Sequence, residues 1–187
     1  MEIRHLILDR DGVLNREQAR YITQPADFHW IPGALEALST FRRLGLRVSL
    51  ATNQSAVGRQ IMTEEQLEEV HARMRYDVLR HGGSLDAVLV CAHSPEACCV
   101  CRKPAPGLMD AAIALSGIRR TQTLVVGDDA RDLEAARQAG LAAVLVRTGK
   151  GRVTEARVMG SETEVFEDLQ HFATALMQRA NSRHHYA

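Results

Sequence analysis

Short runs of apolar residues alternate along this chain with longer stretches in which apolar residues recur at helical spacing. Each run is followed by polar or glycine-bearing residues, a pattern that is typical of buried strands in a parallel sheet. Five strands are expected, at 3–8, 47–51, 87–91, 123–126 and 143–146. Helices are expected at 34–44, 63–78, 107–116, 130–139 and 165–177, with Thr63 and Gln66 spaced for a capping box. This alternation predicts a doubly wound, Rossmann-like α/β fold around a mainly parallel sheet.

The chain length of 187 residues suits one well-packed domain. We expect that domain to span 1–181 and a flexible tail to follow at 182–187, because no apolar period continues there. About 40 residues separate the first strand end from Thr52, and about 50 separate Thr52 from the next basic segment, so usual element lengths leave no room for a cap domain. The segment 147–151 is expected to be a glycine turn without a helix.

The charge balance argues against two classes of partner. Lys plus Arg and Asp plus Glu both number 23, so no overall charge favours nucleic acid or an anionic membrane. No apolar segment approaches the roughly 18 residues of a membrane span, and no basic and apolar leader precedes the first strand. We therefore expect a cytoplasmic monomer whose recognition of any charged ligand is local.

Polar side chains follow four of the five expected strands, at the sheet edge where doubly wound folds bind their ligands. The segments are 9–12, 52–55, 102–103 and 127–129. Each of them alone is typical of turn or helix-cap chemistry. Together they bring carboxylates, a hydroxyl, amides and cations to one place. Acidic groups so close together repel each other unless a hard divalent cation lies among them, and Mg²⁺ is the natural candidate.

These groups indicate phosphoryl transfer from a phosphate ester. Asp9 is the expected nucleophile, and Asp11 is the acid/base partner that protonates the leaving alkoxide and then activates water. Lys103 and the hydroxyl of Thr52 are expected to hold the phosphate oxygens, while Asp128 completes the magnesium site.

The same residues resemble the haloacid dehalogenase (HAD) superfamily of aspartyl-phosphate hydrolases. Its pattern of Asp-x-Asp-Gly, Thr, Lys and Gly-Asp-x-x-x-Asp is similar to 9–12, Thr52, Lys103 and 127–132. The resemblance implies a HAD-like fold in which Mg²⁺ is held by Asp9, by the backbone carbonyl of Asp11 and by Asp128. Asp132, one helical turn after Asp128, is expected to orient Lys103 through a salt bridge.

All four cysteines fall in one short segment, which suggests a metal site in an intracellular chain. Three thiolates and one imidazole suit tetrahedral zinc, and four protein ligands leave no position for water, so the site is expected to be structural. The expected zinc ligands are Cys91, His93, Cys99 and Cys101. Cys98 is an alternative to Cys99. Zinc would fix the loop 91–101, which leads into Arg102 and Lys103.

The sequence Cys-x-His followed by Cys-x-Cys-Arg-Lys-Pro resembles the HAD branch that acts on heptose bisphosphate and histidinol phosphate. Ser55 and the lack of a fused dehydratase domain favour removal of the 7-phosphate from a heptose 1,7-bisphosphate, a small sugar phosphate. The resemblance implies contacts with the substrate from Asn53, Gln54, Ser55, Arg102, Tyr21 and Asp129. Asp129 stands where some members carry a substrate-contacting lysine.

Alternative interpretations remain at this point. Histidinol phosphate or another small phosphate ester is the alternative substrate. A phospho-receiver domain also carries an acidic pocket, a Thr and a Lys on a parallel sheet, but its phosphorylated Asp follows the third strand, where this chain has the cysteine loop. A binding module on an inactive enzyme fold is a third interpretation, which the presence of Asp9, Asp11, Lys103 and Asp128 disfavours.

Overall fold

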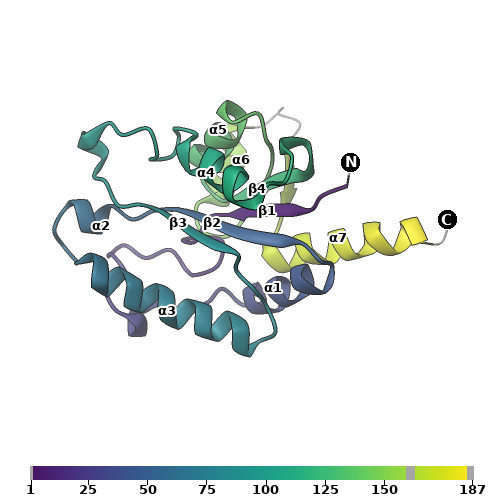
Figure 1. Ribbon diagram of the computed structural model, residues 1–187, viewed down its shortest axis with the longest axis horizontal. Helices are drawn as coiled ribbons and strands as arrows, with labels where there is room; N and C mark the ends of the chain where they lie inside the picture. The colour runs from purple at the N-terminus through teal and green to yellow at the C-terminus, as the bar shows by residue number, and fades with distance from the viewer. Residues whose placement is uncertain (1, 159–162, 185–187) are drawn as a thin grey trace.

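The computed structural model describes residues 2–158 and 163–184 and contains one parallel sheet covered by helices on both faces (Figure 1). The strand order is β3-β2-β1-β4-β5-β6. The strands are β1 His5–Leu8, β2 Arg47–Asn53, β3 Ala87–Cys91, β4 Thr123–Gly127, β5 Ala142–Val146 and β6 Glu164–Phe166. The helices are α1 Ala34–Arg43, α2 Ser55–Gly58, α3 Glu64–Arg80, α4 Gly107–Ser116, α5 Ala130–Gln138, α6 Gly151–Arg157 and α7 Leu169–His184. The predicted doubly wound α/β fold is confirmed.

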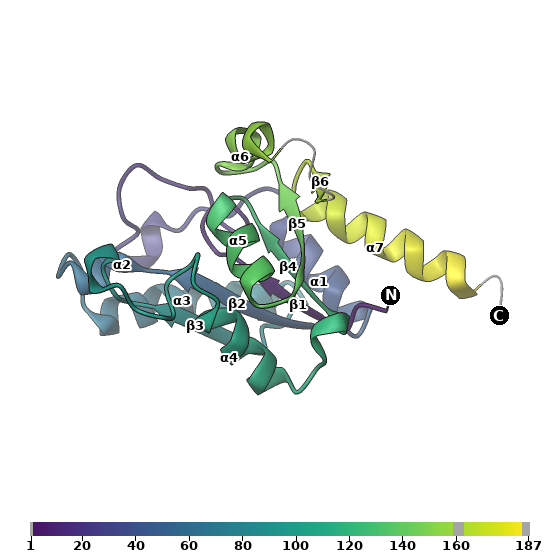
Figure 2. The same cartoon turned by 90° about the horizontal axis from the view of Figure 1, so that it is seen from above.

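The central strand β1 is buried on both faces, which explains why its residues form a continuous apolar run. Leu6 and Leu8 belong to the core beneath α1, α3 and α7, where Phe41 and Phe172 lie with their ring centroids 5.9 Å apart. Ile7 points the other way, into the core beneath α4 and α5. Figure 2 shows α4 and α5 on the face of the sheet opposite α1 and α3.

The chain reverses its direction of winding between β1 and β4. From β1 the sheet grows through β2 to β3 on one side, and through β4 to β6 on the other. Leu8 is in register with Leu50 on β2 and with Val126 on β4, so the three strands end at the same edge. A crevice forms outside the carboxyl ends of the strands at such a switch point.

The expected capping box is confirmed at the start of α3. Gln66 N donates to Thr63 Oγ1 at 3.2 Å, and Thr63 N donates to Gln66 Oε1 at 2.8 Å. Between β1 and β2, and between β2 and β3, the described residues form loops, a short turn at Pro25–Asp27 and the helices α1 to α3. These segments leave the crevice without an inserted cap domain, as expected.

The structure corrects the expected helix at 165–177. Val165 and Phe166 pair in parallel with β5 and form the sixth strand. α7 begins only at Leu169, because Asp168 Oδ1 accepts a hydrogen bond from His171 N at 2.8 Å and caps the first turn.

Two further expectations about the C-terminal third were wrong in part. The segment after β5 is not helix-free, since α6 begins at Gly151 and Thr154 N donates to Lys150 O at 3.0 Å. α7 continues to His184, past the start of the expected tail at 182–187, and Ser182 Oγ donates to Gln178 O one turn earlier. The remaining tail residues, 185–187, lie outside the described part of the chain.

Candidate active site

The polar segments predicted at the strand ends line one cavity of about 310 Å³ at the switch point. It contains every residue that was predicted to act in catalysis, magnesium binding or substrate binding. They are Asp9, Asp11, Tyr21, Thr52, Asn53, Gln54, Ser55, Arg102, Lys103, Asp128 and Asp129. The four segments therefore meet in space as their positions in the sequence predicted.

Lys103 lies between two carboxylates at the floor of the cavity. Its Nζ is 2.9 Å from Asp9 Oδ1 and 2.6 Å from Asp132 Oδ1, so the expected pairing with Asp132 is confirmed. Burial alone would lower the pKa of Lys103, but Asp132 and Asp9 raise it above its ordinary value. The ammonium group is thus a fixed positive charge beside Asp9, suited to a phosphoryl oxygen.

The expected nucleophile, Asp9, differs from an ordinary surface carboxylate because other negatively charged groups lie close to it. Burial raises its pKa to about 7, against the opposing effect of Lys103 and with help from Asp132 and Asp11. Burial likewise raises the pKa of Asp128 to about 8, reinforced by Asp9 and Asp132. Oxygen atoms of Asp9, Asp128 and Asp132 lie within 4.8 Å of one another. Such a set of hard, mutually repelling oxygen donors fits a divalent cation such as Mg²⁺.

Asp128 is held in place by two glycines that leave no room for a side chain. A Cβ on Gly12 or on Gly149 would lie 2.1 Å from Asp128 Oδ2, and both residues have positive φ angles, 84° and 56°. Lys150 N donates to the same oxygen at 2.7 Å. The turn after β1 and the turn after β5 therefore close on this carboxylate.

The expected acid/base residue, Asp11, faces the cavity while its carboxylate is held from behind. Arg10 Nη2 lies 3.0 and 2.9 Å from its two oxygens, Asn15 Nδ2 donates to Oδ1 at 2.9 Å, and Gln54 Nε2 donates to Oδ2 at 2.8 Å. Burial would raise the pKa of Asp11, but Arg10 and the hydrogen bonds from Asn15 and Gln54 lower it. Asp11 is a carboxylate in this state, with 29% of its side chain exposed.

Two residues that were predicted to contact the substrate are engaged elsewhere. Asn53 Oδ1 accepts from Lys103 N at 3.1 Å, and its Nδ2 donates to Lys103 O at 3.0 Å, so it fixes the lysine backbone. Gln54 Nε2 bonds Thr52 Oγ1 at 2.8 Å as well as Asp11. Both amides line the cavity, but their contacts in the structure orient catalytic groups.

Charged side chains of both signs surround the mouth of the cavity. Asp129 caps α5 and pairs with Arg131 at 2.7 Å, and Lys150 Nζ lies 3.5 Å from the same carboxylate and also pairs with Glu17. Although burial acts in the opposite direction, the hydrogen bonds from Arg131 lower the pKa of Asp129 to about 2. The acidic residue at this position is thus matched by two cations.

The remaining predicted substrate residues lie on the opposite side of the mouth. Tyr21 Oη is 3.5 Å from Ser55 Oγ, which connects the loop after β1 to the start of α2. Arg102 Nη1 donates to His93 O at 3.3 Å, so the arginine rests on the cysteine loop.

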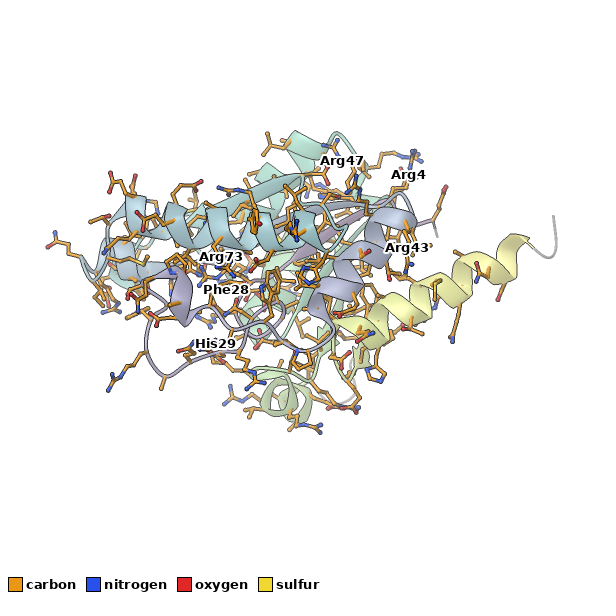
Figure 3. The ribbon with its side chains drawn as sticks, turned by 90° about the horizontal axis from the view of Figure 1, so that it is seen from below. Arg4, Phe28, His29, Arg43, Arg47 and Arg73 are labelled. Carbon is orange, nitrogen blue, oxygen red and sulfur yellow. The ribbon has the colours of Figure 1, made fainter. Side chains whose placement is uncertain are left out.

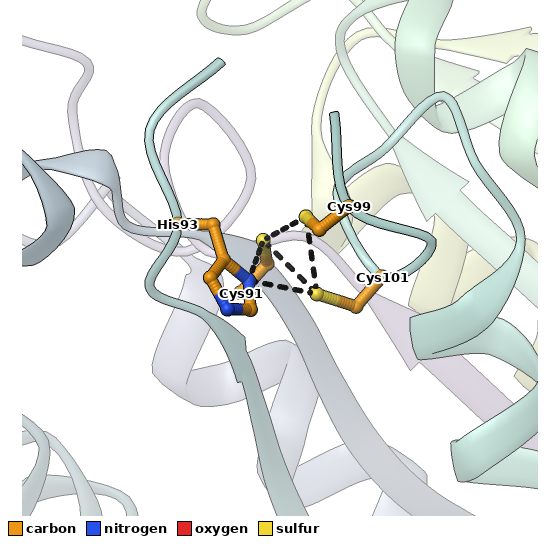
Figure 4. A group of neighbouring side chains, drawn as sticks. All are labelled: Cys91, His93, Cys99 and Cys101. Carbon is orange, nitrogen blue, oxygen red and sulfur yellow. Dashed lines mark hydrogen bonds between the residues drawn. The ribbon is translucent and has the colours of Figure 1, made fainter. Parts of the chain in front are cut away.

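The four expected zinc ligands converge at the end of β3 (Figure 4). The sulfur atoms of Cys91, Cys99 and Cys101 are 3.3 to 3.6 Å apart, and His93 Nδ1 lies 3.3 Å from Cys101 Sγ and 3.7 Å from Cys91 Sγ. A zinc–sulfur distance of about 2.3 Å puts tetrahedral ligands about 3.8 Å apart, so the cluster needs little expansion to hold the ion. Cys98 is exposed and outside the cluster, so the geometry favours Cys99 over Cys98 as the fourth ligand.

Three sulfur atoms and one ring nitrogen in mutual contact form a donor set that fits a cation such as Zn²⁺. Burial, followed by hydrogen bonding to Cys101, raises the pKa of Cys91 to about 12. Binding of a metal ion would therefore require the loss of this proton.

Sequence reasoning gave no role to several cavity residues, among them Arg10, Glu17, Arg131 and Lys150. Arg10 lies inside the quoted Asp-x-Asp motif, and Arg131 lies inside the Gly-Asp-x-x-x-Asp motif. Their positions within the motifs were a usable signal. Lys150 follows a fifth strand end, where the same rule that located the other segments applied.

Comparisons with known proteins agree with this geometry. A family model described as HAD-hydrolase-like matches residues 100–172. A D-glycero-beta-D-manno-heptose-1,7-bisphosphate 7-phosphatase from Bordetella bronchiseptica is 38% identical over 94% of this chain and 98% of its own length. One with the same name from Pseudomonas aeruginosa is 39% identical over 92% of this chain and 97% of its own.

Solved structures show the same relationship. The crystal structure of D,D-heptose 1,7-bisphosphate phosphatase from B. bronchiseptica, complexed with magnesium and phosphate, matches with a TM-score of 0.90 over 95% of this chain and 99% of that chain, at 38% identity. The enzyme from Burkholderia thailandensis matches with a TM-score of 0.73 at 32% identity, over 93% and 98%. Membership of an enzyme family excludes the phospho-receiver interpretation. The chain belongs to the D-glycero-β-D-manno-heptose-1,7-bisphosphate 7-phosphatase family of HAD-like hydrolases.

Proposed function

We propose that this chain hydrolyses the 7-phosphate of D-glycero-β-D-manno-heptose 1,7-bisphosphate through an aspartyl-phosphate intermediate. The observation that carries the proposal is the convergence of Asp9, Asp11, Lys103 and Asp128 in one cavity at the switch point. Relatives of that name align with nearly the whole chain, and the related B. bronchiseptica structure contains magnesium and phosphate.

In the first step, a carboxylate oxygen of Asp9 attacks phosphorus, and the bond from phosphorus to the sugar oxygen breaks. Asp11 donates a proton to that leaving oxygen. Lys103 and Thr52 hold the phosphoryl oxygens as charge moves onto the leaving group. Asp9, Asp128 and the backbone carbonyl of Asp11 would hold Mg²⁺, which would neutralise negative charge between Asp9 and the phosphoryl group.

In the second step, Asp11 takes a proton from water, whose oxygen attacks the phosphorus of the aspartyl phosphate. Inorganic phosphate leaves, and Asp9 is regenerated as a carboxylate. The lowered pKa of Asp11 suits this base role directly. Its acid role requires a proton gained with the substrate, because the negative charge of the bound phosphoryl group raises the pKa of a neighbouring carboxylate.

We assign zinc to the cysteine cluster in a structural role. The ligand set Cys91, His93, Cys99 and Cys101 is complete, and the chain continues directly from Cys101 into Arg102 and Lys103. Fixing this loop fixes both Arg102, the cation predicted to contact the substrate, and the catalytic lysine.

A single domain over 1–181 that acts as a cytoplasmic monomer is consistent with these assignments. None of the four cysteines forms a disulfide in the described part of the chain, which is typical of a reducing compartment. Among the described residues, no helix has both the length and the apolar character that a membrane crossing requires.

The proposed function is tested by phosphate release from heptose 1,7-bisphosphate, with histidinol phosphate and simple sugar phosphates assayed alongside. We expect one equivalent of phosphate per bisphosphate and the highest kcat/KM for the heptose substrate. Asp9→Asn should lower kcat by on the order of 10³-fold or more, because the nucleophile is lost.

The matched control is Asp110→Asn, which makes the same change at an exposed carboxylate on α4 and should leave kcat unchanged. Near-normal turnover by Asp9→Asn would contradict the mechanism. A preference for histidinol phosphate would contradict the substrate assignment while leaving the mechanism intact.

A further inference from the structure

Arg10 is the largest fully buried side chain in the protein's described part and lies directly behind the acid/base residue. Only 1% of its surface is exposed, and its Nη2 donates to both oxygens of Asp11 and to Gln54 Oε1 at 3.0 Å. A buried guanidinium is costly unless its donors are satisfied. The fold therefore buries the charge of Arg10, which is unfavourable in free energy, in direct contact with the catalytic carboxylate of Asp11.

The other end of this guanidinium is held by a helix that contributes no residue to the cavity. His71, on α3, is 2% exposed, and its Nε2 lies 3.1 Å from Arg10 Nη1. Arginine can only donate, so His71 Nε2 accepts the bond and its proton is on Nδ1. Burial, together with Arg10 and Arg75, lowers the pKa of His71 to about 3, which keeps the ring neutral as this contact requires.

Aromatic packing closes the site around Arg10. Its Cζ lies 6.0 Å from the centroid of the Phe28 ring, and Phe28 meets Trp30 edge-on at 5.0 Å. Trp30 Nε1 donates to Asp77 Oδ2 on α3 at 3.1 Å. Figure 3 views the molecule from the side of α3 and labels Phe28 and Arg73. The helix thus fixes Arg10 by a hydrogen bond and by packing.

We propose that His71 is a positioning residue for the acid/base step, acting through Arg10 on Asp11. The contact from His71 occupies Nη1 and turns the guanidinium so that Nη2 meets both oxygens of Asp11. With Asn15 and Gln54 on its other sides, the carboxyl group has one orientation, toward the leaving oxygen in the cavity. The inference rests on the proposed function, because it requires Asp11 to be the proton donor.

Loss of this positioning has a signature that a general loss of stability does not have. A sugar alkoxide leaves poorly without a proton, whereas p-nitrophenolate is a stable anion and leaves without one. A misplaced Asp11 therefore slows formation of the aspartyl phosphate from a sugar phosphate and spares its formation from p-nitrophenyl phosphate. Hydrolysis of the aspartyl phosphate, in which Asp11 acts as the base, is common to both substrates and does not affect kcat/KM, which reports on the steps up to release of the leaving group. Binding of the phosphoryl group by Lys103 and Thr52 is the same for both substrates.

The test compares kcat/KM for heptose 1,7-bisphosphate and p-nitrophenyl phosphate in His71→Leu and His71→Gln, with Asp11→Asn as the reference. His71→Leu should lower kcat/KM for the sugar phosphate about 10-fold or more and that for the aryl phosphate less than about 3-fold. His71→Gln retains an acceptor for Arg10 and should restore the sugar phosphate rate. Met74→Leu, a buried change on the same helix away from Arg10, should affect neither substrate.

The outcomes separate this inference from the proposed function. If Asp11→Asn lowers kcat/KM equally for both substrates, Asp11 is not the proton donor and the proposed mechanism fails. If Asp11→Asn shows the selective loss and folded His71→Leu does not, only the inference is overturned. Should circular dichroism show His71→Leu unfolded, Arg10→Lys is assayed instead, because it keeps the charge but cannot meet His71 and both Asp11 oxygens. An equal loss on both substrates would overturn the inference there too.

Discussion

Three carboxylates and one ammonium group share the floor of the cavity. Asp9, Asp128 and Asp132 have only Lys103 as a close cation among the described residues, and the pKa values of Asp9 and Asp128 rise to about 7 and about 8. Folding thus leaves unbalanced negative charge, so the carboxylates repel one another and would also repel a bound phosphate ester. A divalent cation would reduce both repulsions, since it neutralises the carboxylates and attracts the phosphoryl group.

Asp132 is distinguished from the other two carboxylates by its contacts. It pairs with Lys103 through Oδ1, and its Oδ2 accepts from Asp129 N at 3.1 Å. We predict that Asp132→Asn lowers kcat by on the order of 10- to 100-fold, because Lys103 loses its anchor and pairs with Asp9 instead of phosphate. Steady-state kinetics with a sugar phosphate measures this change.

The control for this prediction is Glu134→Gln on the same helix. Glu134 pairs with Arg137 in an exposed salt bridge, which contributes little to stability. Its amide variant should match wild type in kcat. A kcat for Asp132→Asn within about twofold of wild type would show that Asp9 alone holds the lysine.

At the scale of single residues, the chemistry of the site could be predicted from the sequence better than the contacts between its residues could. Asp9 and Asp128 were recoverable because each directly follows a strand, and Lys103 because the loop after the third strand leads to it; strand ends meet by topology. The pairing of Asn53 with the Lys103 backbone was not recoverable, because it depends on the distance between two loops. The burial of Arg10 runs against the usual exposure of arginine.

Among the elements, the loop after β3 joins the cysteine cluster to the active site. Gln54 N donates to Cys91 O at 2.8 Å, and Gly58 N donates to Ala92 O at 2.9 Å, so β2 and α2 also rest on this loop. Gly58 has no room for a side chain, since a Cβ would lie 2.6 Å from Ser94 N. A disordered loop would therefore displace several cavity residues together.

We predict about one zinc ion per chain and its loss in Cys101→Ser. Removing one of four ligands weakens the site, and kcat/KM should fall because Arg102 and Lys103 follow Cys101 directly. Elemental analysis of protein purified without chelator measures the metal content. Cys98→Ser is the matched control, since this neighbouring thiol is exposed and outside the cluster. Loss of zinc in Cys98→Ser but not in Cys101→Ser would contradict the ligand assignment.

Sequence patterns missed short elements, among them β6 and α6. β6 has only three residues, and its apolar Val165 and Phe166 merge into the helical period of α7. α6 begins with Gly151, where there is no room for a side chain, because a Cβ would lie 1.7 Å from the carbonyl oxygen of Val146. Both elements depend on tertiary pairing, which a local pattern does not contain.

At the scale of the whole molecule, β1 is both the central strand of the sheet and the strand that leads into the catalytic groups. Its four residues are fully buried between β2 and β4, and the next residue is Asp9. His5 begins the strand and is also completely enclosed. Its Nε2 lies 2.9 Å from Ser49 Oγ on β2, and its Nδ1 lies 3.4 Å from Thr123 Oγ1 on β4. An ionisable ring therefore lies at the centre of the sheet.

His5 makes the stability of the whole domain depend on pH. Burial, with a smaller contribution from Arg47, lowers its pKa from 6.5 to about 4, so the unfolded chain binds the proton first as the pH falls. The stabilisation is complete above pH 6.5 and is lost between pH 6.5 and 4, at up to about 1.4 kcal/mol for each pH unit. Urea unfolding at pH 7.5, 6 and 5 should show the free energy of unfolding of wild type falling relative to His5→Gln, while the exposed control His29→Gln tracks wild type. If the free energies of unfolding of wild type and His5→Gln instead changed in parallel with pH, the His5 ring would be protonated in the folded protein without opening the sheet.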